Sequence, residues 1–216
     1  MAQLFPRFAN TIARVSIAAV VLGVCALGWA TYAITWSPYY TGVERPRDQP
    51  VPFSHEHHVS GLGIDCRYCH TSVEKSSFAG IPSTEICMTC HSQLWRDTPM
   101  LEPVRESWTT GNRLRWNRVH DVPDYVYFDH SIHVQKGVAC VTCHGRVDRM
   151  PLISKTQSLY MKWCLECHRA PERHLQPKSE VFVMKDVRAD PARGRELMHA
   201  YGIGNRRLED CSICHR

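Results

Sequence analysis

The sequence has little that would build long regular elements. Strand-like runs are sparse and amount to fragments such as Tyr125–Phe128, which argues against a sheet-based fold. No acidic residue precedes the run from Val15 to Trp36, and that run itself carries no charge. The chain is instead rich in cysteine and histidine, which account for 11 and 13 of its 216 residues. The spacing of these two residue types is the most informative feature of the chain.

Ten of the eleven cysteines fall into five Cys-x-x-Cys-His motifs, which we number I to V. They are Cys66, Cys69 and His70; Cys87, Cys90 and His91; Cys140, Cys143 and His144; Cys164, Cys167 and His168; and Cys211, Cys214 and His215. This motif is typical of c-type haem attachment, in which two thiols add across the haem vinyl groups and the histidine becomes the proximal iron ligand. The sequence therefore predicts five covalently bound c-type haems and a role in electron transfer.

Zinc binding and disulfide formation are the alternatives to haem attachment. The spacings from Cys69 to Cys87 and from Cys143 to Cys164 both fit a four-cysteine zinc site. Motif V would then have no partner. Neither alternative explains why a histidine follows the second cysteine of every pair. We therefore favour haem.

The N-terminal part predicts a membrane anchor. The run from Val15 to Trp36 suits one transmembrane helix and exceeds the usual apolar core of a secretory signal. Arg7 and Arg14 precede it, so the N-terminus is expected to stay in the cytoplasm. We expect a retained single-pass anchor in the inner (cytoplasmic) membrane, with the haem domain on the periplasmic side. Cys25 within the run is interpreted as an apolar side chain of the helix.

The formal net charge of +5 does not indicate a nucleic-acid partner. A ferric haem with two axial histidines contributes about −1, since the porphyrin and the two propionates outweigh the iron. Five such haems bring the formal total to about zero. The basic side chains are therefore expected mostly to neutralise propionates.

The chain is expected to be mainly α-helical with much irregular structure, one N-terminal transmembrane helix and a domain packed around haems. Short helices are predicted near the motifs, such as Gln157–Arg169, and another is predicted from an N-cap at Asp190 to about Gly202.

An internal repeat organises the middle of the chain. Phe53, His55 and His58 precede motif I by a few residues, and Phe128, His130 and His133, with the same spacing among themselves, precede motif III in the same way. Each copy is followed by a second motif. We therefore divide the chain into an anchor (1–37), a linker (38–52), a first dihaem module (53–95), a docking or connecting arm (96–124), a second dihaem module (125–175) and a C-terminal monohaem segment (176–216).

The His-x-x-His pairs of this repeat are the predicted distal iron ligands. Residues at i and i+3 share one face of a helical turn, so neighbouring imidazoles can reach the irons of two stacked haems. The pattern resembles class III multihaem cytochromes. That resemblance implies that His55 serves the haem of motif I and His130 that of motif III, while His58 and His133 serve other haems and cross-link the modules.

A fifth distal ligand is needed if all five irons are six-coordinate. His120 is favoured because it immediately precedes the second module, and Met161, three residues before Cys164, is the rival. A methionine ligand would raise the potential of that haem relative to two histidines. His57 lies one step off the ligand face.

Several segments together resemble the membrane-anchored pentahaem subunit of bacterial alternative complex III, a quinol:electron-acceptor oxidoreductase. They are Phe53–His55, Gly63–His70, Val119–Asp121 with Pro123–Asp124, Met161–Cys164 and Leu208–Arg216. The resemblance implies three kinds of partner: an iron–sulfur subunit, quinol-binding integral membrane subunits, and a monohaem cytochrome c or terminal oxidase. It also implies that this subunit does not hold the quinol site. Related multihaem subunits of quinone reductase complexes share parts of the pattern, which leaves the direction of electron flow open.

Two other functions were weighed. A stand-alone quinol-dehydrogenase cytochrome resembles a pattern in which Cys-His-x-Met follows a haem motif, and that mark is absent here. A multihaem reductase needs an open iron position, whereas this chain has enough histidines to close all five and no Cys-x-x-Cys-Lys variant. We therefore expect an electron-transfer component with no catalytic site of its own.

Overall fold

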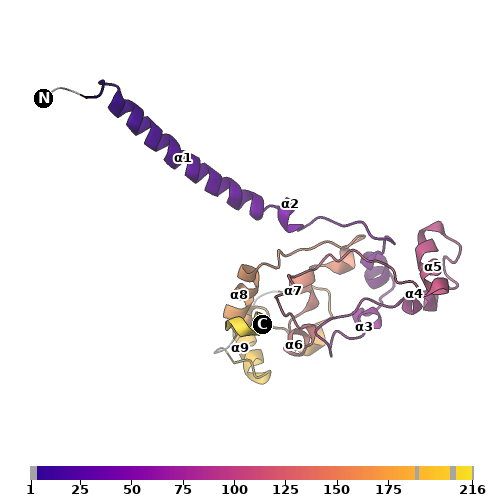
Figure 1. The fold of residues 1–216 in the computed structure, drawn as a ribbon. Helices are drawn as coiled ribbons and strands as arrows, with labels where there is room; N and C mark the ends of the chain where they lie inside the picture. The colour runs from indigo at the N-terminus through magenta and orange to yellow at the C-terminus, as the bar shows by residue number, and fades with distance from the viewer. Residues whose placement is uncertain (1–3, 188–189, 205–207, 216) are drawn as a thin grey trace. The chain divides into compact units, whose positions relative to one another are not determined.

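The protein is described by a computed structural model that covers residues 4–187, 190–204 and 208–215. The chain divides into two compact units, Met1–Gly42 and Val43–Arg216. This division falls inside the segment predicted as a linker. Figure 1 shows the long helix of the first unit and the short helices of the second.

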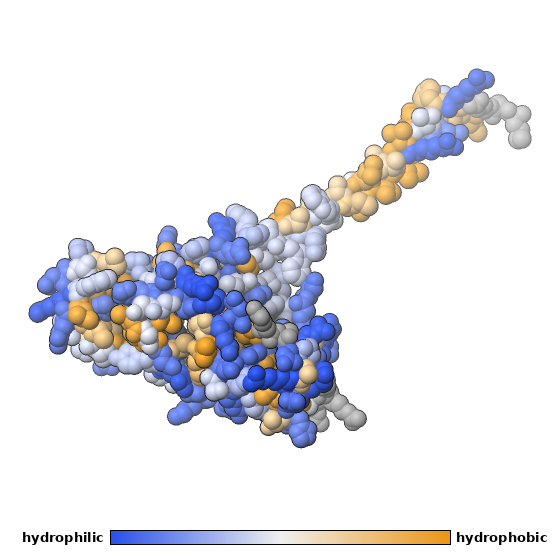
Figure 2. All heavy atoms as spheres, turned by 180° about the vertical axis from the view of Figure 1, so that it is seen from behind, coloured by the Kyte–Doolittle hydropathy of each residue, from blue (hydrophilic) through white to orange (hydrophobic). Residues whose placement is uncertain are grey.

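The first unit consists of helix α1 (Ala9–Thr35) and the short helix α2 (Pro38–Thr41). Helix α1 has a mean hydropathy of 2.1 and is long and apolar enough to cross a membrane. At 1.5 Å per residue its 27 residues span about 40 Å, more than the roughly 30 Å of a bilayer core. Figure 2 shows apolar residues along the visible face of this helix. The helix begins six residues before the predicted run, because the polar Asn10, Thr11 and Arg14 do not interrupt helical backbone.

The second unit contains only short helices joined by irregular segments. They are η1 (Glu56–Gly61, a π-helix), α3 (Cys66–Cys69), α4 (Thr84–His91), η2 (Pro99–Leu101), α5 (Glu102–Thr110), α6 (His130–Gln135), α7 (Cys140–His144), η3 (Val147–Arg149), α8 (Met161–Arg169), η4 (Pro171–Arg173), η5 (Lys178–Glu180), α9 (Pro191–Ala200) and α10 (Cys211–Cys214). Within the described ranges no strand forms, and pairing is limited to three isolated bridges. The predicted mainly helical, irregular fold is therefore confirmed.

Aspartate side chains begin several of these helices. Asp65 accepts a hydrogen bond from the Arg67 amide at the start of α3, and Asp129 accepts one from Ser131 at the start of α6. Asp190 caps α9 through the amides of Ala192 and Arg193, as its position before a proline predicts. These caps fix where each short helix begins. Helix α3 carries the cysteines of motif I, and α6 carries His130 and His133.

The protein's own apolar core is small. One cluster contains the buried Val51, Leu101 and Val104, and another contains Val73, Val134 and Val181. The first cluster includes residues of the segment 96–124, which was predicted as a docking or connecting arm. The arm forms helix α5, whose apolar face packs against α4 and motif II. Its role in docking stays a prediction.

Two further predictions need adjustment. Helix α8 begins at Met161 rather than at Gln157, because Leu159 adopts a positive φ of 60° that does not fit a helix. The fragment at Tyr125–Phe128 forms no named strand, and its Val126 makes a single antiparallel bridge with His215 of motif V.

Candidate haem-binding sites

The internal repeat has the same local geometry in both copies. The ring of Phe53 stacks on His58 at 4.4 Å and meets His55 edge-on at 4.9 Å. Phe128 stacks on His133 at 4.6 Å and meets His130 edge-on at 4.7 Å. Each phenylalanine ring is therefore nearly perpendicular to the first imidazole of its pair and tilted by only 25° from the second.

Four of the five motif histidines are oriented by main-chain carbonyls. The Nδ1 atom of His70 donates to Gly80 at 2.6 Å, and that of His91 donates to Leu94 at 3.1 Å. His168 donates to Leu208 at 2.6 Å, and His215 donates to Tyr125 at 3.2 Å. Such a bond fixes the tautomer and leaves Nε2 available to a metal.

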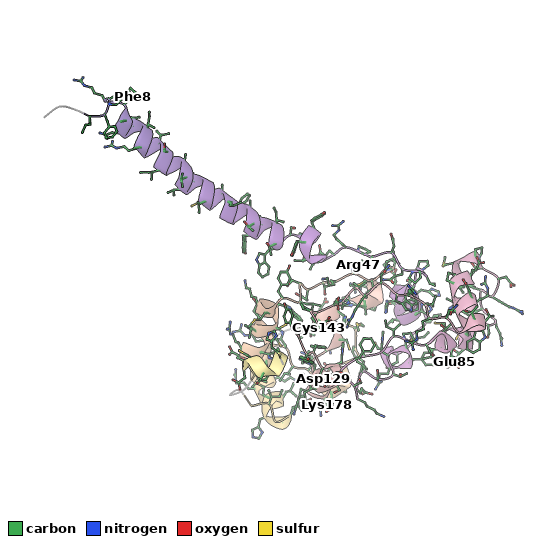
Figure 3. All side chains as sticks on the ribbon, in the orientation of Figure 1. Phe8, Arg47, Glu85, Asp129, Cys143 and Lys178 are labelled. Carbon is green, nitrogen blue, oxygen red and sulfur yellow. The ribbon has the colours of Figure 1, made fainter. Side chains whose placement is uncertain are left out.

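Three of the predicted distal histidines are held in the same way. His58 donates from Nδ1 to the carbonyl of Ser54 at 2.8 Å, and His133 donates to that of Asp129 at 2.6 Å. His130 donates across the molecule to Ser77 at 2.8 Å. Figure 3 labels Asp129 together with Cys143 of motif III. In total, seven histidines present Nε2 as their free nitrogen.

Three pairs of these histidines face one another at a common separation. The ring centroids lie 6.2 Å apart for His58 and His91, 6.3 Å for His130 and His144, and 6.2 Å for His133 and His168. Two imidazoles on opposite sides of one iron, with metal–nitrogen bonds of about 2.0 Å, have centroids about 6.3 Å apart. The spacing thus fits one axial pair for each of motifs II, III and IV.

The pairing differs from the expectation that His58 and His133 cross-link modules. His58 faces the second motif of its own module, and His133 does the same in the second module. The reason is geometric. One helical turn separates the two histidines of a pair, and in each module this turn lies between the two motifs that follow it in the chain.

The surroundings of motifs I and III gather several histidines. The rings of His120 and His144 lie 4.3 Å apart, in edge contact. Burial, followed by the nearby His70, His58 and His120, lowers the pKa of His55 to about 4. Two buried nitrogens, Nδ1 of His55 and Nε2 of His120, have no hydrogen-bond partner among the described residues. For His120 the unpaired atom is Nε2, the same ring nitrogen that the other proposed ligands leave available to a metal.

Burial also keeps the other histidines of this region neutral. Burial, followed by His120 and His130, lowers the pKa of His144 to about 3. The pKa of His120 is lowered to about 4 by burial, then by Lys155 and His130. Iron binds the neutral imidazole, so these three side chains are available as ligands throughout the neutral range.

Motif V has a different neighbour. The ring of Tyr125 stacks on His215 at 5.8 Å, and the Tyr127 amide donates to the Cys214 carbonyl at 2.8 Å. His120, the favoured fifth ligand, lies beside motif III instead. Met161, its rival, is 58% exposed at the first position of α8. Which iron His120 serves, and what completes motif V, therefore stay predictions.

The ten motif cysteines are unbridged, so the structure gives no support to five disulfides. Within the described ranges no three His, Cys, Asp or Glu side chains converge as a bare metal ion requires. A four-cysteine zinc site would need two pairs to converge, whereas a haem needs one cysteine pair and one or two axial ligands. The donor sets thus fit haem and do not fit the zinc alternative.

Sequence reasoning did not identify the orienting groups. The carbonyls of Gly80, Leu94 and Leu208 lie in irregular segments, and every residue carries such a carbonyl, so no sequence signal marks them. Tyr125 was noted only as part of a strand-like fragment. Among the residues that support the proposed ligands, only Phe53 and Phe128 were marked in the sequence, because they recur in both copies of the repeat.

Comparison with known proteins agrees with a multihaem cytochrome c. Residues 126–216, which contain motifs III to V, match the family described as cytochrome c7 and related cytochrome c. The described residues are mostly helical, and the matched segment is similar to cytochrome c7-like multihaem domains.

Among characterised proteins, a multihaem cytochrome c subunit is also similar to this chain. The chain is 29% identical over 170 residues to the menaquinone reductase, multihaem cytochrome c subunit, of Nitratidesulfovibrio vulgaris. The match covers 78% of this chain and 68% of that protein.

Proposed function

We propose that this chain is a membrane-anchored pentahaem cytochrome c that carries electrons within a quinone-linked respiratory complex. The observation that carries the proposal is the set of three histidine pairs at 6.2–6.3 Å, each spanning one distal and one motif histidine. Five of their six rings are also oriented through Nδ1, so that Nε2 faces the space between the pair.

The residues of each motif have distinct roles in this proposal. The two cysteines attach the haem, and the motif histidine, His70, His91, His144, His168 or His215, binds from the proximal side. His55, His58, His130 and His133 bind from the distal side, and His120 is proposed as the fifth distal ligand. Bound c-type haem supplies one-electron redox chemistry, and axial ligand identity is a main determinant of its potential.

We further propose that α1 anchors the chain in the inner membrane, with Arg7 and Arg14 on the cytoplasmic side and the second unit on the periplasmic side. Its length and hydropathy support membrane insertion. Its exposed side chains include a continuous series of apolar residues, as contact with lipid requires.

The complex is proposed to oxidise quinol, as the resemblance to alternative complex III implies. An integral membrane subunit would then bind quinol, an iron–sulfur subunit would pass electrons to this chain, and a monohaem cytochrome c or terminal oxidase would accept them. This chain contributes no catalytic site of its own. Helix α1 carries no acid or histidine, and proton-coupled quinol oxidation ordinarily needs a positioned proton acceptor.

A second candidate reverses the direction of flow. The relative from Nitratidesulfovibrio vulgaris is named as a subunit of a menaquinone reductase, and it matches most of this chain. In that case electrons would enter the haems from a soluble donor and leave toward quinone. Membranes containing the complex distinguish the two: haem reduction on addition of quinol, blocked by a quinone-site inhibitor, supports the first direction. Haem reoxidation on addition of quinone, after reduction by a cytochrome donor, supports the second.

The haem content tests the proposal as a whole. Full-length protein purified from membranes should have an intact mass that exceeds 24.8 kDa by five haem masses. A pyridine haemochrome assay should give the spectrum of c-type haem at the same stoichiometry. Bound zinc, or fewer than four haems, would contradict the proposal.

A further inference from the structure

Direct contacts join the segments of motifs I and II. Tyr68 and Thr89 are both variable residues inside their motifs, and the Tyr68 hydroxyl lies 2.9 Å from Oγ1 of Thr89. One turn carries His55 and His58, and of these His58 faces motif II. Motifs I and II are therefore neighbours.

Motif I also contacts the segments around motif III. The loop after motif I accepts two hydrogen bonds at the Ser77 carbonyl, from the amide (3.1 Å) and Nδ1 (2.8 Å) of His130. His130 in turn faces His144 of motif III. On the other side, η1 before motif I packs on η3 after motif III, where the Ser60 hydroxyl donates to the Asp148 carbonyl at 2.5 Å. Motif III is therefore the second neighbour of motif I.

Helix α6 joins motif III to motif IV. His130 and His133 lie three residues apart on this helix, and their rings face His144 of motif III and His168 of motif IV. The Thr156 hydroxyl, on the segment leading to motif IV, donates to the Cys143 carbonyl at 3.3 Å.

Motif IV is tied to the segment of motif V. Nδ1 of His168 donates to the Leu208 carbonyl at 2.6 Å, and Arg169 pairs with Glu209 at 2.9 Å. Leu208 and Glu209 lie immediately before Cys211.

From these contacts we infer that the five haem sites form one unbranched row in the order II, I, III, IV, V, with motifs II and V as its two ends. This order differs from the order of the motifs along the chain. In the view of Figure 1, α4 and α8 lie toward opposite sides of the second unit, with α3 and α7 between them, as the order II, I, III, IV requires. The inference rests on the proposed function, and it names the two sites at which partners exchange electrons with the chain.

Exposure of the cysteines supports the same ends independently. Cys90 of motif II and Cys211 of motif V are exposed, whereas the other eight motif cysteines are partly buried. An end site has one neighbouring site to cover it and an interior site has two, so the ends are expected to be the more accessible. Electron exchange with partners is fastest at the shortest distance, which places it at these two sites.

Light-driven reduction from one end tests the order. A ruthenium photosensitiser is attached to a Ser92→Cys thiol beside motif II, in full-length holoprotein carrying Cys25→Ala so that no other thiol reacts. Four further variants each lack one site through replacement of both motif cysteines by alanine. Under illumination with a sacrificial donor, electrons enter at motif II and stop at the missing site. The row therefore predicts rapid reduction of one haem in the variant without motif I and of two haems in the variant without motif III. It predicts three haems for the variant without motif IV and all four for the variant without motif V.

The alternatives give other counts. If IV and V are still reduced rapidly without III, the row is branched or differently ordered, and the inference fails. Mass spectrometry of each variant is the control: four haems show that the remaining sites are loaded. Fewer than four haems in the unmodified protein would contradict the proposed function, whereas five haems with the wrong counts contradict only the order.

A second measurement covers variants that do not fold without a haem. His58→Ala at motif II and His133→Ala at motif IV keep every cysteine, and each is expected to make one ferric haem high-spin. In electron paramagnetic resonance spectra the new high-spin centre should broaden one low-spin signal for His58→Ala and two for His133→Ala. Two broadened signals for His58→Ala would show that motif II is not an end.

Discussion

His133 faces His168 with 6.2 Å between the ring centroids, and its own Nδ1 donates to the Asp129 carbonyl at the start of the same helix. His58 and His91 repeat this arrangement in the first module, with Ser54 in place of Asp129. In both modules the proposed ligand pair joins a histidine held by a carbonyl four residues before it to the histidine of a motif more than thirty residues further along the chain.

The two adjacent histidines of module 1 give a matched test of ligation. His58→Ala should convert one haem from low-spin to high-spin, because its ring is the one facing His91. His57→Ala should leave the spin state unchanged, since His57 stacks on Trp95 instead, at 5.6 Å. Electron paramagnetic resonance and the absorbance band of high-spin ferric haem measure the change. A high-spin haem in His57→Ala alone would contradict the assignment.

The fifth distal ligand can be decided by another pair of variants. His120→Ala should make one haem high-spin, while Met161→Leu should leave the spectrum unchanged, because the Nε2 atom of the partly buried His120 is buried and unpaired, whereas Met161 is 58% exposed. The reverse outcome would assign the site to Met161. In that case the haem concerned should also titrate at a higher potential than the others.

The Arg146–Asp148 pair is expected to stabilise the contact between η1 and η3. The guanidinium donates to both carboxylate oxygens, at 2.8 and 2.6 Å, and Asp148 is buried. Asp148→Asn should reduce the free energy of unfolding by about 2 kcal/mol, the usual worth of a charged hydrogen bond. Glu180→Gln is the control, because it breaks a more exposed pair with Lys185 and should change stability by less than about 1 kcal/mol.

The same pair predicts a pH dependence. The hydrogen bonds from Arg146 hold the pKa of Asp148 below its usual value. A carboxyl with a lowered folded pKa stabilises the protein above its unfolded pKa of about 3.9, and this contribution is lost as the pH falls through the folded pKa. Chemical denaturation between pH 6 and pH 2 should therefore show a smaller loss of stability for Asp148→Asn than for the unmodified protein. Equal slopes would contradict the assignment.

Gly194 allows α9 to approach η4. A Cβ at this position would fall on the carbonyl of Glu172, whereas nothing lies within 4 Å of the position at Gly204. Gly194→Ala should therefore destabilise the protein by about 1–3 kcal/mol through overpacking, and Gly204→Ala should not. Thermal unfolding of the two variants, followed by Soret-band absorbance, measures the difference. Equal midpoints would show that α9 packs elsewhere.

The isolated chain should not oxidise quinol. Purified holoprotein mixed with quinol is expected to show haem reduction no faster than the solution background, whereas the assembled complex should reduce all five haems. The reason is that α1 carries no acid or histidine to accept a proton. Rapid, inhibitor-sensitive reduction of the isolated chain would favour the stand-alone dehydrogenase.

Local patterns in the sequence predicted the parts of the molecule that depend on local geometry. The motifs, the cap at Asp190 and the shared face of His55 and His58 all rest on residues a few positions apart. The partner of His58 could not be predicted from local pattern. It is His91 at the end of α4, more than thirty residues after His58 in the chain, and the contact depends on how η1 and α4 meet. Helix α5 was not predicted, because its single proline, Pro103, and its mixed charge hide an apolar face that packs on motif II.

The His-x-x-His turn has a consequence for how such a protein can change over time. If one turn of helix supplies ligands to two neighbouring sites, as proposed, the pitch of the helix, and not the length of a loop, sets the distance between them. Segments that join one module to the next could then change in length without moving the two sites that share a turn. A single insertion between His130 and His133 would instead rotate one ligand away by about 100° and break the row at that point.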